Sequence, residues 1–200
     1  MIKTLGQLRS LYAAPKERTL RKQLERLDVH CTRFIGYSPF VVLSSSGANG
    51  ALDTSPRGGS PGFVKVLNEK TLLLPDSPGN NRLDTLENIV STGQIGMLFL
   101  IPGVDETLRV NGQAELSVDA ALLGEFSGQA RVPKLVVRIS VRDAYLHCAK
   151  AMMRSELWEP ARHLKRESLP TMGQMLADQI GTNTPVETQA EMLARYQAYL

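Results

Sequence analysis

The stretch ETLRVNGQAEL, residues 106–116, carries the clearest secondary-structure pattern in this chain of 200 residues. Apolar residues such as Leu108 and Val110 alternate with polar ones along it. A period of two sustained over this length predicts a β-strand with its apolar residues on one face. Gly112 falls on the apolar face, where a bend or a close approach of another backbone is expected.

Five further segments are predicted to be strands. They are residues 39–43, 62–67, 71–74, 95–101 and 134–141. Residues 62–67 and 71–74 are separated by a short polar link, which is typical of a hairpin. Short strands in series favour an antiparallel barrel, and regular alternation of strands and helices, which a doubly wound dinucleotide-binding sheet requires, is absent. The expected fold class is mainly β with helices (α+β), built on six antiparallel strands.

Helices are expected before, between and after these strands. The segments are residues 4–12, 15–28, 83–90, 118–126, 143–158, 170–180 and 187–199. Apolar residues at helical spacing, and Pro15 in a first turn, support the N-terminal helices. The expected organisation is N-terminal helices packed on the barrel (1–33), a barrel domain (34–160) and a C-terminal helical tail (161–200).

Composition argues against several classes of function. The hydrophobic content of 42% supplies a core, and a formal net charge of +3 is too small to indicate a nucleic-acid-binding surface. No apolar run approaches the roughly 18 residues that cross a membrane, and the N-terminus lacks the apolar core of a signal peptide. Cys31 and Cys148 stand alone. Two free thiols predict a reducing, cytoplasmic setting.

Common catalytic motifs are missing. His30, His147 and His163 are far apart in the sequence, so no metal site is expected. GGSPG (58–62) matches the letters of the G-x-S-x-G nucleophile elbow, but that motif needs a helix directly after it. Pro61 and a predicted strand follow instead, which argues against a hydrolase. No P-loop or dinucleotide-binding glycine motif is present.

The stretch PDSPGNNR (75–82) lies between a predicted strand and a predicted helix. Asn80 or Asn81 suits a helix N-cap, and the free amide groups at a helix start favour an anion. Arg82 adds a planar donor group suited to phosphate. The alternative is an ordinary capped helix with a solvated arginine, because two acidic residues in the first turn could satisfy the same helix end.

A second donor-rich stretch is DTSPRGGSPG (53–62). Ser55, Arg57 and Ser60 offer hydrogen-bond donors, and the glycines would let the backbone approach a ligand. A flexible exposed loop is the alternative interpretation.

A third candidate group lies on the predicted helix 143–158. His147, Lys150, Arg154 and Trp158 fall on one face of that helix. This cationic stripe, ending in an aromatic residue, could contact a flavin, a phosphate or a partner subunit. The alternative is a solvated face with Trp158 packed beneath it.

Three runs together indicate a family. They are SPRGGSPGFVKVLNEKTLLLPDSPGNNRLDTLENI (55–89), IGMLFLIPGVDETLRVNGQAEL (95–116) and HCAKAMMRSELW (147–158). They resemble the pyridoxamine 5'-phosphate oxidase-like FMN-binding split-barrel proteins, in particular a bacterial branch of FMN-dependent enzymes of unknown substrate. The resemblance covers residues 34–160. It implies a six-stranded antiparallel split barrel, a homodimer, and FMN bound at the subunit interface.

The resemblance also implies roles for individual residues. Arg82, preceded by Asn80 and Asn81, takes the position of the cation that holds the flavin phosphate. Ser60, Phe63, Val64 and Lys65 correspond to the strand that borders the isoalloxazine ring, Leu74 and Pro75 to the end of the next strand, and Thr107 to a polar flavin contact. The stripe from His147 to Trp158 would close the site from the other subunit, with Arg154 and Trp158 on the substrate side.

One departure from the family pattern concerns the phosphate. The oxidase proper has an arginine where this chain has Ser60, so Arg57, three residues earlier, is the expected substitute, with Ser55 as a further donor. The C-terminal substrate signature of the oxidase is also not evident, which makes pyridoxamine phosphate a doubtful substrate.

The resulting expectation is an FMN-dependent oxidoreductase with an unknown small-molecule substrate and NAD(P)H as a candidate electron donor. The flavin would carry the redox step, which agrees with the lack of an acid–base constellation. A non-catalytic protein that stores or senses FMN is the alternative. A third possibility is a flavin-free domain that acts through its helices and its dimer surface.

Overall fold

The computed structural model describes residues 1–129, 131–182 and 186–197. The chain divides into two compact units, Met1–Ser155 and Glu156–Leu200. The first unit holds the sheet, and the second is built of short helices. The domain limits expected from the sequence, after residues 33 and 160, stay a prediction.

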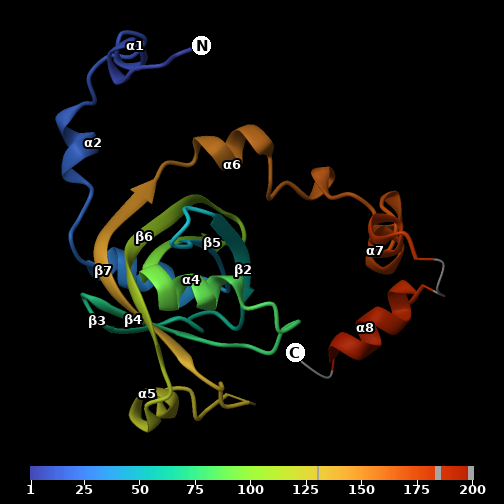
Figure 1. The fold of residues 1–200 in the computed structure, drawn as a ribbon. Helices are drawn as coiled ribbons and strands as arrows, with labels where there is room; N and C mark the ends of the chain where they lie inside the picture. The colour runs from blue at the N-terminus through green and yellow to red at the C-terminus, as the bar shows by residue number, and fades with distance from the viewer. Residues whose placement is uncertain (130, 183–185, 198–200) are drawn as a thin grey trace. The chain divides into compact units, whose positions relative to one another are not determined.

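A seven-stranded sheet forms the centre of the first unit. Its strands are β1 (Phe40–Ser46), β2 (Leu52–Gly58), β3 (Lys65–Asn68), β4 (Thr71–Pro75), β5 (Gln94–Ile101), β6 (Val104–Ser117) and β7 (Val136–His147). They lie in the order β2-β1-β5-β6-β7-β4-β3, and every neighbouring pair is antiparallel. Figure 1 shows the sheet curled round on itself. The expected mixed fold with an antiparallel sheet is confirmed, with seven strands rather than six.

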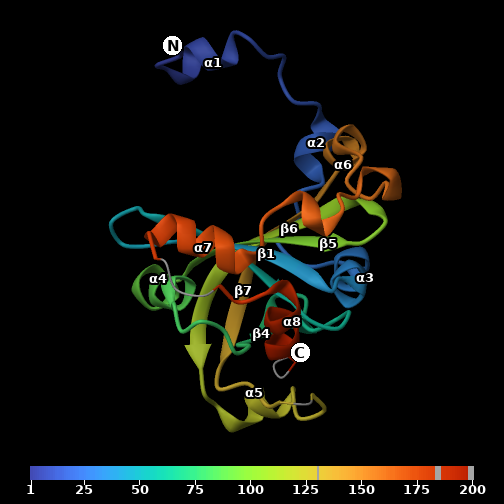
Figure 2. The ribbon, with the colours of Figure 1, turned by 90° about the vertical axis from the view of Figure 1, so that its right-hand side faces the viewer.

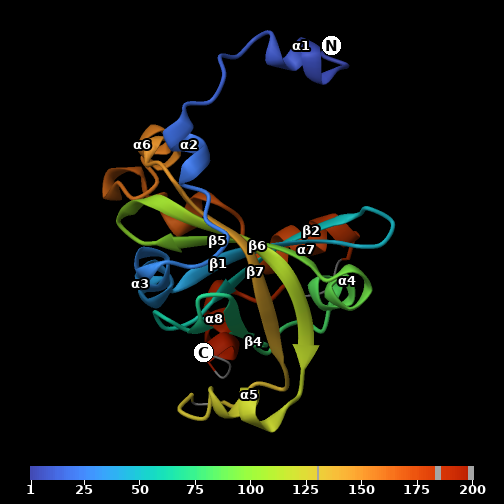
Figure 3. The same ribbon diagram turned by 90° about the vertical axis from the view of Figure 1, so that its left-hand side faces the viewer.

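Six helices accompany the sheet in the described part of this unit. They are α1 (Leu5–Arg9), α2 (Glu17–Arg21), α3 (Val29–Tyr37), α4 (Asp84–Thr92), α5 (Ala120–Gly124) and α6 (Lys150–Ser155). Helices α3 and α4 lie on opposite sides of the curled sheet (Figures 2 and 3). Each brings one isoleucine, Ile35 or Ile89, into the apolar cluster that also contains Phe99 and Leu108. The two helices therefore help to close the core.

The N-terminal segment joins the sheet only after α2. Neither α1 nor α2 has a buried residue. Leu24 then exchanges both backbone hydrogen bonds with Ala144 of β7, at 2.9 and 2.8 Å, and Leu27 is buried. The predicted helix 15–28 is wrong outside α2, because from Leu24 on the backbone bonds to the sheet instead of to itself.

The second unit contains two 3-10 turns, Pro160–Arg162 and Arg166–Ser168, and two helices, α7 (Met172–Ile180) and α8 (Gln189–Gln197). Thr171 caps α7 by accepting a hydrogen bond from the amide of Gln174 at 3.2 Å. The helices expected at 170–180 and 187–199 are confirmed. The last two residues of the second prediction lie outside the described residues.

The close approach expected at Gly112 is confirmed. The pairing of β6 with β7 shifts register between Asn111 and Gly112. A Cβ atom added to Gly112 would stand 2.3 Å from the carbonyl oxygen of Ser140 on β7. Because no side chain fits at that distance, the bulge depends on glycine.

The predicted helix 143–158 is wrong in its first third. Residues Asp143 to His147 continue β7, where Tyr145 pairs with Arg109 and His147 pairs with Thr107 of β6. Only Lys150–Ser155 is helical. Pairing with the long strand β6 overrides the local helical tendency of this segment.

Candidate functional site

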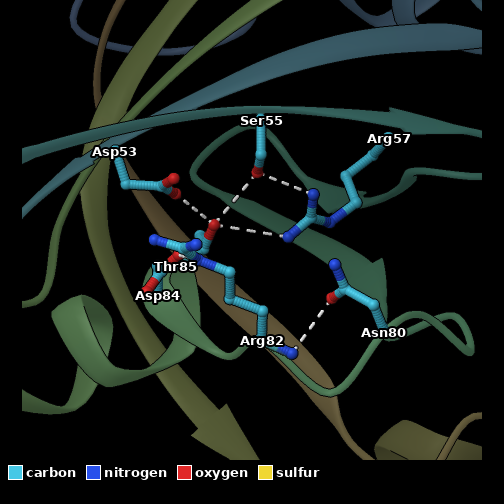
Figure 4. A pocket seen from close by; sticks show the side chains of 7 residues that line it. All are labelled: Asp53, Ser55, Arg57, Asn80, Arg82, Asp84 and Thr85. Atoms are coloured by element: carbon cyan, nitrogen blue, oxygen red, sulfur yellow. Dashed lines mark hydrogen bonds and ion pairs between the residues drawn. The ribbon is translucent and has the colours of Figure 1, made fainter. Parts of the chain in front are cut away.

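A pocket of about 260 Å³ lies where the edge strand β2 meets the start of α4. It is lined by Asp53, Ser55 and Arg57 of β2, Asn80 and Arg82 of the connecting loop, and Asp84 and Thr85 of α4. Figure 4 shows these side chains converging from β2, from the connecting loop and from the start of α4, so the two stretches nominated separately from the sequence, 53–62 and 75–82, contribute to one pocket. The structure thus brings together four of the predicted cofactor residues, namely Ser55, Arg57, Asn80 and Arg82.

Strand β2 presents its polar residues to the pocket through simple alternation. Asp53, Ser55 and Arg57 are half-buried, whereas Thr54 and Pro56 between them are exposed. Among the described residues the strand pairs only with β1 and forms one end of the sheet order, a position that tolerates a proline. The interpretation of this stretch as a flexible loop is therefore wrong for residues 53–58, which belong to β2 and pair with β1, whereas residues 59–62 lie outside the strand.

The guanidinium of Arg57 is held on one side by two hydroxyls. Its Nη1 donates to Ser55 Oγ at 2.7 Å and to the Pro56 carbonyl at 2.8 Å, and its Nη2 donates to Thr85 Oγ1 at 3.3 Å. The described residues provide no acceptor for Nε–H or for the second Nη2 hydrogen. These two donors lie along one edge of the planar group and form a fork suited to a phosphate or carboxylate. In Figure 4 this edge faces away from Ser55, toward Asn80 and Arg82.

The start of α4 is not capped as the sequence suggested. Leu83 is the N-cap residue and makes no side-chain capping bond. Asn80 Oδ1 instead accepts from the amide of Arg82 at 3.0 Å, and Asn81 adopts a left-handed backbone with φ of 59°. The expected N-cap role of Asn80 or Asn81 is therefore wrong. The helix start still suits an anionic ligand, because the first-turn amides of α4 have no capping side chain among the described residues.

The guanidinium of Arg82 is less available to an anionic ligand than that of Arg57. Its side chain is 77% exposed and its Nε pairs with Asp84. The hydrogen bond and charge of Asp84 raise the pKa of Arg82. The pocket as a whole carries two guanidinium groups and two carboxylates. An anion that enters it would therefore compete with Asp84 for Arg82, whereas the open edge of Arg57 is available at once.

Arg57 also influences a neighbouring carboxyl group. Burial raises the pKa of Asp76, directly after β4, while the positive charges of Arg57 and Lys134 oppose that shift. The field of Arg57 thus extends beyond the pocket to the end of the hairpin.

The residues expected to border the flavin ring do not line this pocket. Phe63 and Val64 are buried in the main apolar cluster, directly before β3, and Ser60 is exposed in the preceding turn. Lys65 begins β3. Leu74 and Pro75 are buried at the end of β4. Their contact with a cofactor stays a prediction.

Thr107 and His147 meet at a different place on the sheet. They are paired across β6 and β7, and Thr107 is buried. The His147 ring packs edge-on against Tyr145 with 4.9 Å between centroids. Burial, followed by the positive charges of Arg109 and Lys22, lowers the pKa of His147.

Two cations surround Tyr145 beside this pair. Lys22 Nζ lies 4.2 Å and Arg109 Cζ 5.0 Å from the centre of the Tyr145 ring. Arg109 Nε is buried and has no hydrogen-bond partner among the described residues. Neither cation was nominated from the sequence, although Arg109 stands in the strand with the clearest alternation.

The expected stripe from His147 to Trp158 does not form one helical face. His147 belongs to β7, Lys150 and Arg154 belong to α6, and Trp158 lies in the second unit. The stripe was inferred from helical spacing, and the strand at its start removes that spacing.

Within the described ranges, no cluster of three or more histidine, cysteine or carboxylate side chains could hold a metal ion. No helix among the described residues is long and apolar enough to cross a membrane.

Comparison with known proteins identifies the family to which the chain belongs. The family model described as pyridoxamine 5'-phosphate oxidase matches residues 27–148. The chain therefore belongs to the pyridoxamine 5'-phosphate oxidase family.

Solved structures of low sequence identity also match part of the chain. HupZ from Group A Streptococcus is 19% identical, with a TM-score of 0.50 over 60% of this chain and 93% of that one. A putative pyridoxamine 5'-phosphate oxidase from Lactobacillus delbrueckii is 17% identical, with a TM-score of 0.49 over 62% and 98%. An FMN-binding protein from Syntrophomonas wolfei is 13% identical, with a TM-score of 0.42 over 58% and 84%. No curated protein matches the chain.

Proposed function

We propose that this protein binds FMN and acts as an oxidoreductase of the pyridoxamine-phosphate-oxidase type on a small-molecule substrate. The observation that carries the proposal is the open donor edge of Arg57, held in place by Ser55 and Thr85 at an uncapped helix start. Membership of the family supports a flavin as the ligand. FMN ends in a phosphomonoester, the chemical group that such an edge binds well.

The residues of the pocket fit the phosphate end of the cofactor. Arg57 would bind two phosphate oxygens, the first-turn amides of α4 would meet a third, and Arg82 would add a second positive charge after leaving Asp84. When bound, FMN would supply the hydride-accepting chemistry, and the protein would position the ring and exclude water. The ring would extend toward the hairpin of β3 and β4, where the resemblance assigns residues 63–65, 74 and 75.

A homodimer is part of the proposal. The outer surface of β1 and β5 carries half-exposed apolar side chains, with Phe40, Val42, Leu98 and Leu100 on one face. Arg109 Nε, buried and without a partner in the described chain, fits an acceptor supplied by a second copy. NAD(P)H as electron donor and a cytoplasmic location, which the two free cysteines favour, complete the proposal.

The absorption spectrum of the purified protein tests the cofactor assignment. We expect flavin bands, or their appearance on adding FMN, together with tighter binding of FMN than of riboflavin, which lacks the phosphate. Equal affinity for the two would contradict the phosphate site, and binding of neither would refute the proposal. Reduction of the bound flavin by NADPH or NADH, followed by turnover with an acceptor, would distinguish an enzyme from a protein that only stores FMN.

A further inference from the structure

The hydroxyl of Thr85 stands at the centre of the pocket's hydrogen-bond network. Its Oγ1 contacts Asp53 Oδ2, lies 3.0 Å from Ser55 Oγ, and accepts from Arg57 Nη2 at 3.3 Å (Figure 4). Thr85 is only 4% exposed, so water has little access to replace these bonds.

The chemistry of the four groups allows one direction for every hydrogen bond. The Asp53 carboxylate only accepts, so Thr85 gives its single hydroxyl proton to Asp53. The Arg57 guanidinium only donates, so Thr85 and Ser55 both accept from it. Ser55 must then donate its own proton to Thr85, because the proton of Thr85 is already used. All the bonds run from the cation to the anion through two hydroxyls.

This arrangement connects Arg57 to Asp53 without letting them form an ion pair. In the described structure no nitrogen of Arg57 lies within 4.0 Å of an Asp53 oxygen. A guanidinium normally pairs with a nearby carboxylate through two parallel bonds, which would occupy two of its donors. With Thr85 between them, the carboxylate orients the arginine through a hydroxyl, and the Nε–Nη2 edge stays open.

We infer that Thr85 is a positioning residue that keeps Arg57 apart from Asp53 and so holds it ready for a phosphomonoester. The inference rests on the proposed function in naming the flavin phosphate as the ligand. Thr85 acts through Arg57 and does not itself need to touch the cofactor. Loss of the hydroxyl lets Arg57 swing onto Asp53 and close the fork.

The test compares Thr85→Val, which keeps the shape but removes the hydroxyl, with Thr85→Ser, which keeps the hydroxyl. Thr54→Val is the control, since Thr54 lies on β2 between Asp53 and Ser55 but on the exposed face of that strand, away from the pocket. Dissociation constants for FMN and riboflavin are measured by quenching of flavin fluorescence. We expect Thr85→Val to weaken FMN binding roughly tenfold or more, as for lost bonds to a charged group, with riboflavin changed less than about twofold. Thr85→Ser and Thr54→Val should bind like the wild type.

A double variant tests the closing of the fork. If Arg57 turns onto Asp53 when the hydroxyl is lost, Asp53→Ala in the Thr85→Val background should restore part of the FMN affinity. Thermal unfolding confirms that each variant is folded, and Thr85→Ala replaces Thr85→Val if the valine is not accommodated. Unchanged FMN affinity without the hydroxyl overturns the inference, and so does an equal loss for FMN and riboflavin.

A second readout separates this inference from the proposed function. The Nε–H signal of Arg57 is followed by NMR during a titration with inorganic phosphate, in the absence of flavin. A wild-type protein that takes up no FMN refutes the proposed function. The inference then still holds if phosphate shifts the signal in the wild type and not in Thr85→Val. The same shift in both proteins, or a shift in neither, overturns it.

Discussion

Replacement of Arg57 by methionine should weaken FMN binding much more than the same replacement of Arg82. The sequence pattern pointed to Arg82 as the principal phosphate ligand, but the structure gives the two arginines different surroundings. Arg57 is half-buried and anchored, and it has two free donors. Arg82 is largely exposed and paired with Asp84.

The magnitude follows from the bonds that each side chain can make. Each hydrogen bond to a charged group contributes about 1.5–3 kcal/mol. Two such bonds from a half-exposed guanidinium, taken at the lower end for solvent screening, give about 2–3 kcal/mol for Arg57, a factor of roughly 30–150 in affinity. Arg82 would exchange its exposed ion pair with Asp84 for an exposed contact with the phosphate. Removing its side chain should therefore lower the FMN affinity about fivefold or less.

Fluorescence titrations of both variants with FMN and riboflavin would measure these factors. Riboflavin supplies the control, because its affinity should not depend on a phosphate ligand. Asp84→Asn adds a test of the opposite sign, since release of Arg82 from its partner should strengthen FMN binding a few-fold. A larger loss for Arg82→Met than for Arg57→Met would refute the reasoning, because it would show that the exposed ion pair does not hinder the ligand.

Three other predictions concern stability and reactivity. Gly112→Ala should lower the free energy of unfolding by about 2 kcal/mol or more, because its Cβ would collide with the backbone of β7, whereas Gly36→Ala, with open space around it, should not destabilise in the same urea titration. One thiol per native chain should react with iodoacetamide, since burial raises the pKa of Cys31 to about 11 while Cys148 is exposed with a lowered pKa; Cys148→Ser should abolish the reaction. The lowered pKa of His147 should make the protein lose stability as the pH falls below about 6.5, where the unfolded chain binds the proton more readily, and His147→Gln should flatten that part of the profile in thermal melts.

The centre of the sheet could be predicted from the sequence because burial there is one-sided and regular. Strand β6 was predicted from its alternation, and the predicted strands 95–101 and 134–141 coincide with β5 and with the first half of β7. The close approach of another backbone at Gly112 was also predicted correctly. The end of β7 was not predicted, because residues 143–147 suit a helix as well as a strand. The outcome depends on pairing with β6, which is distant in the sequence.

The site was predictable in part. Arg57 and Arg82 were both nominated, from different stretches, but nothing local indicates that they share a pocket. Their meeting depends on β2 pairing with β1, which places the face of β2 against α4. Thr85 was overlooked, because a threonine in the first turn of a short helix is an ordinary residue there until its three partners are known.

Strand β2 was not predicted from the sequence, and the reason is the same feature that makes it part of the candidate site. A strand is recognised from its sequence when one face is apolar, and β2 has no apolar face, because its inner side chains, from Asp53 to Arg57, meet a polar pocket instead of the core. Its position at the sheet edge also permits Pro56, a residue type that in a sequence usually indicates a loop. Local rules are expected to fail where function takes the place of packing. A segment such as DTSPRG, in which acceptors and donors recur at every second residue beside a predicted strand, is therefore better interpreted as an edge strand that carries a binding face.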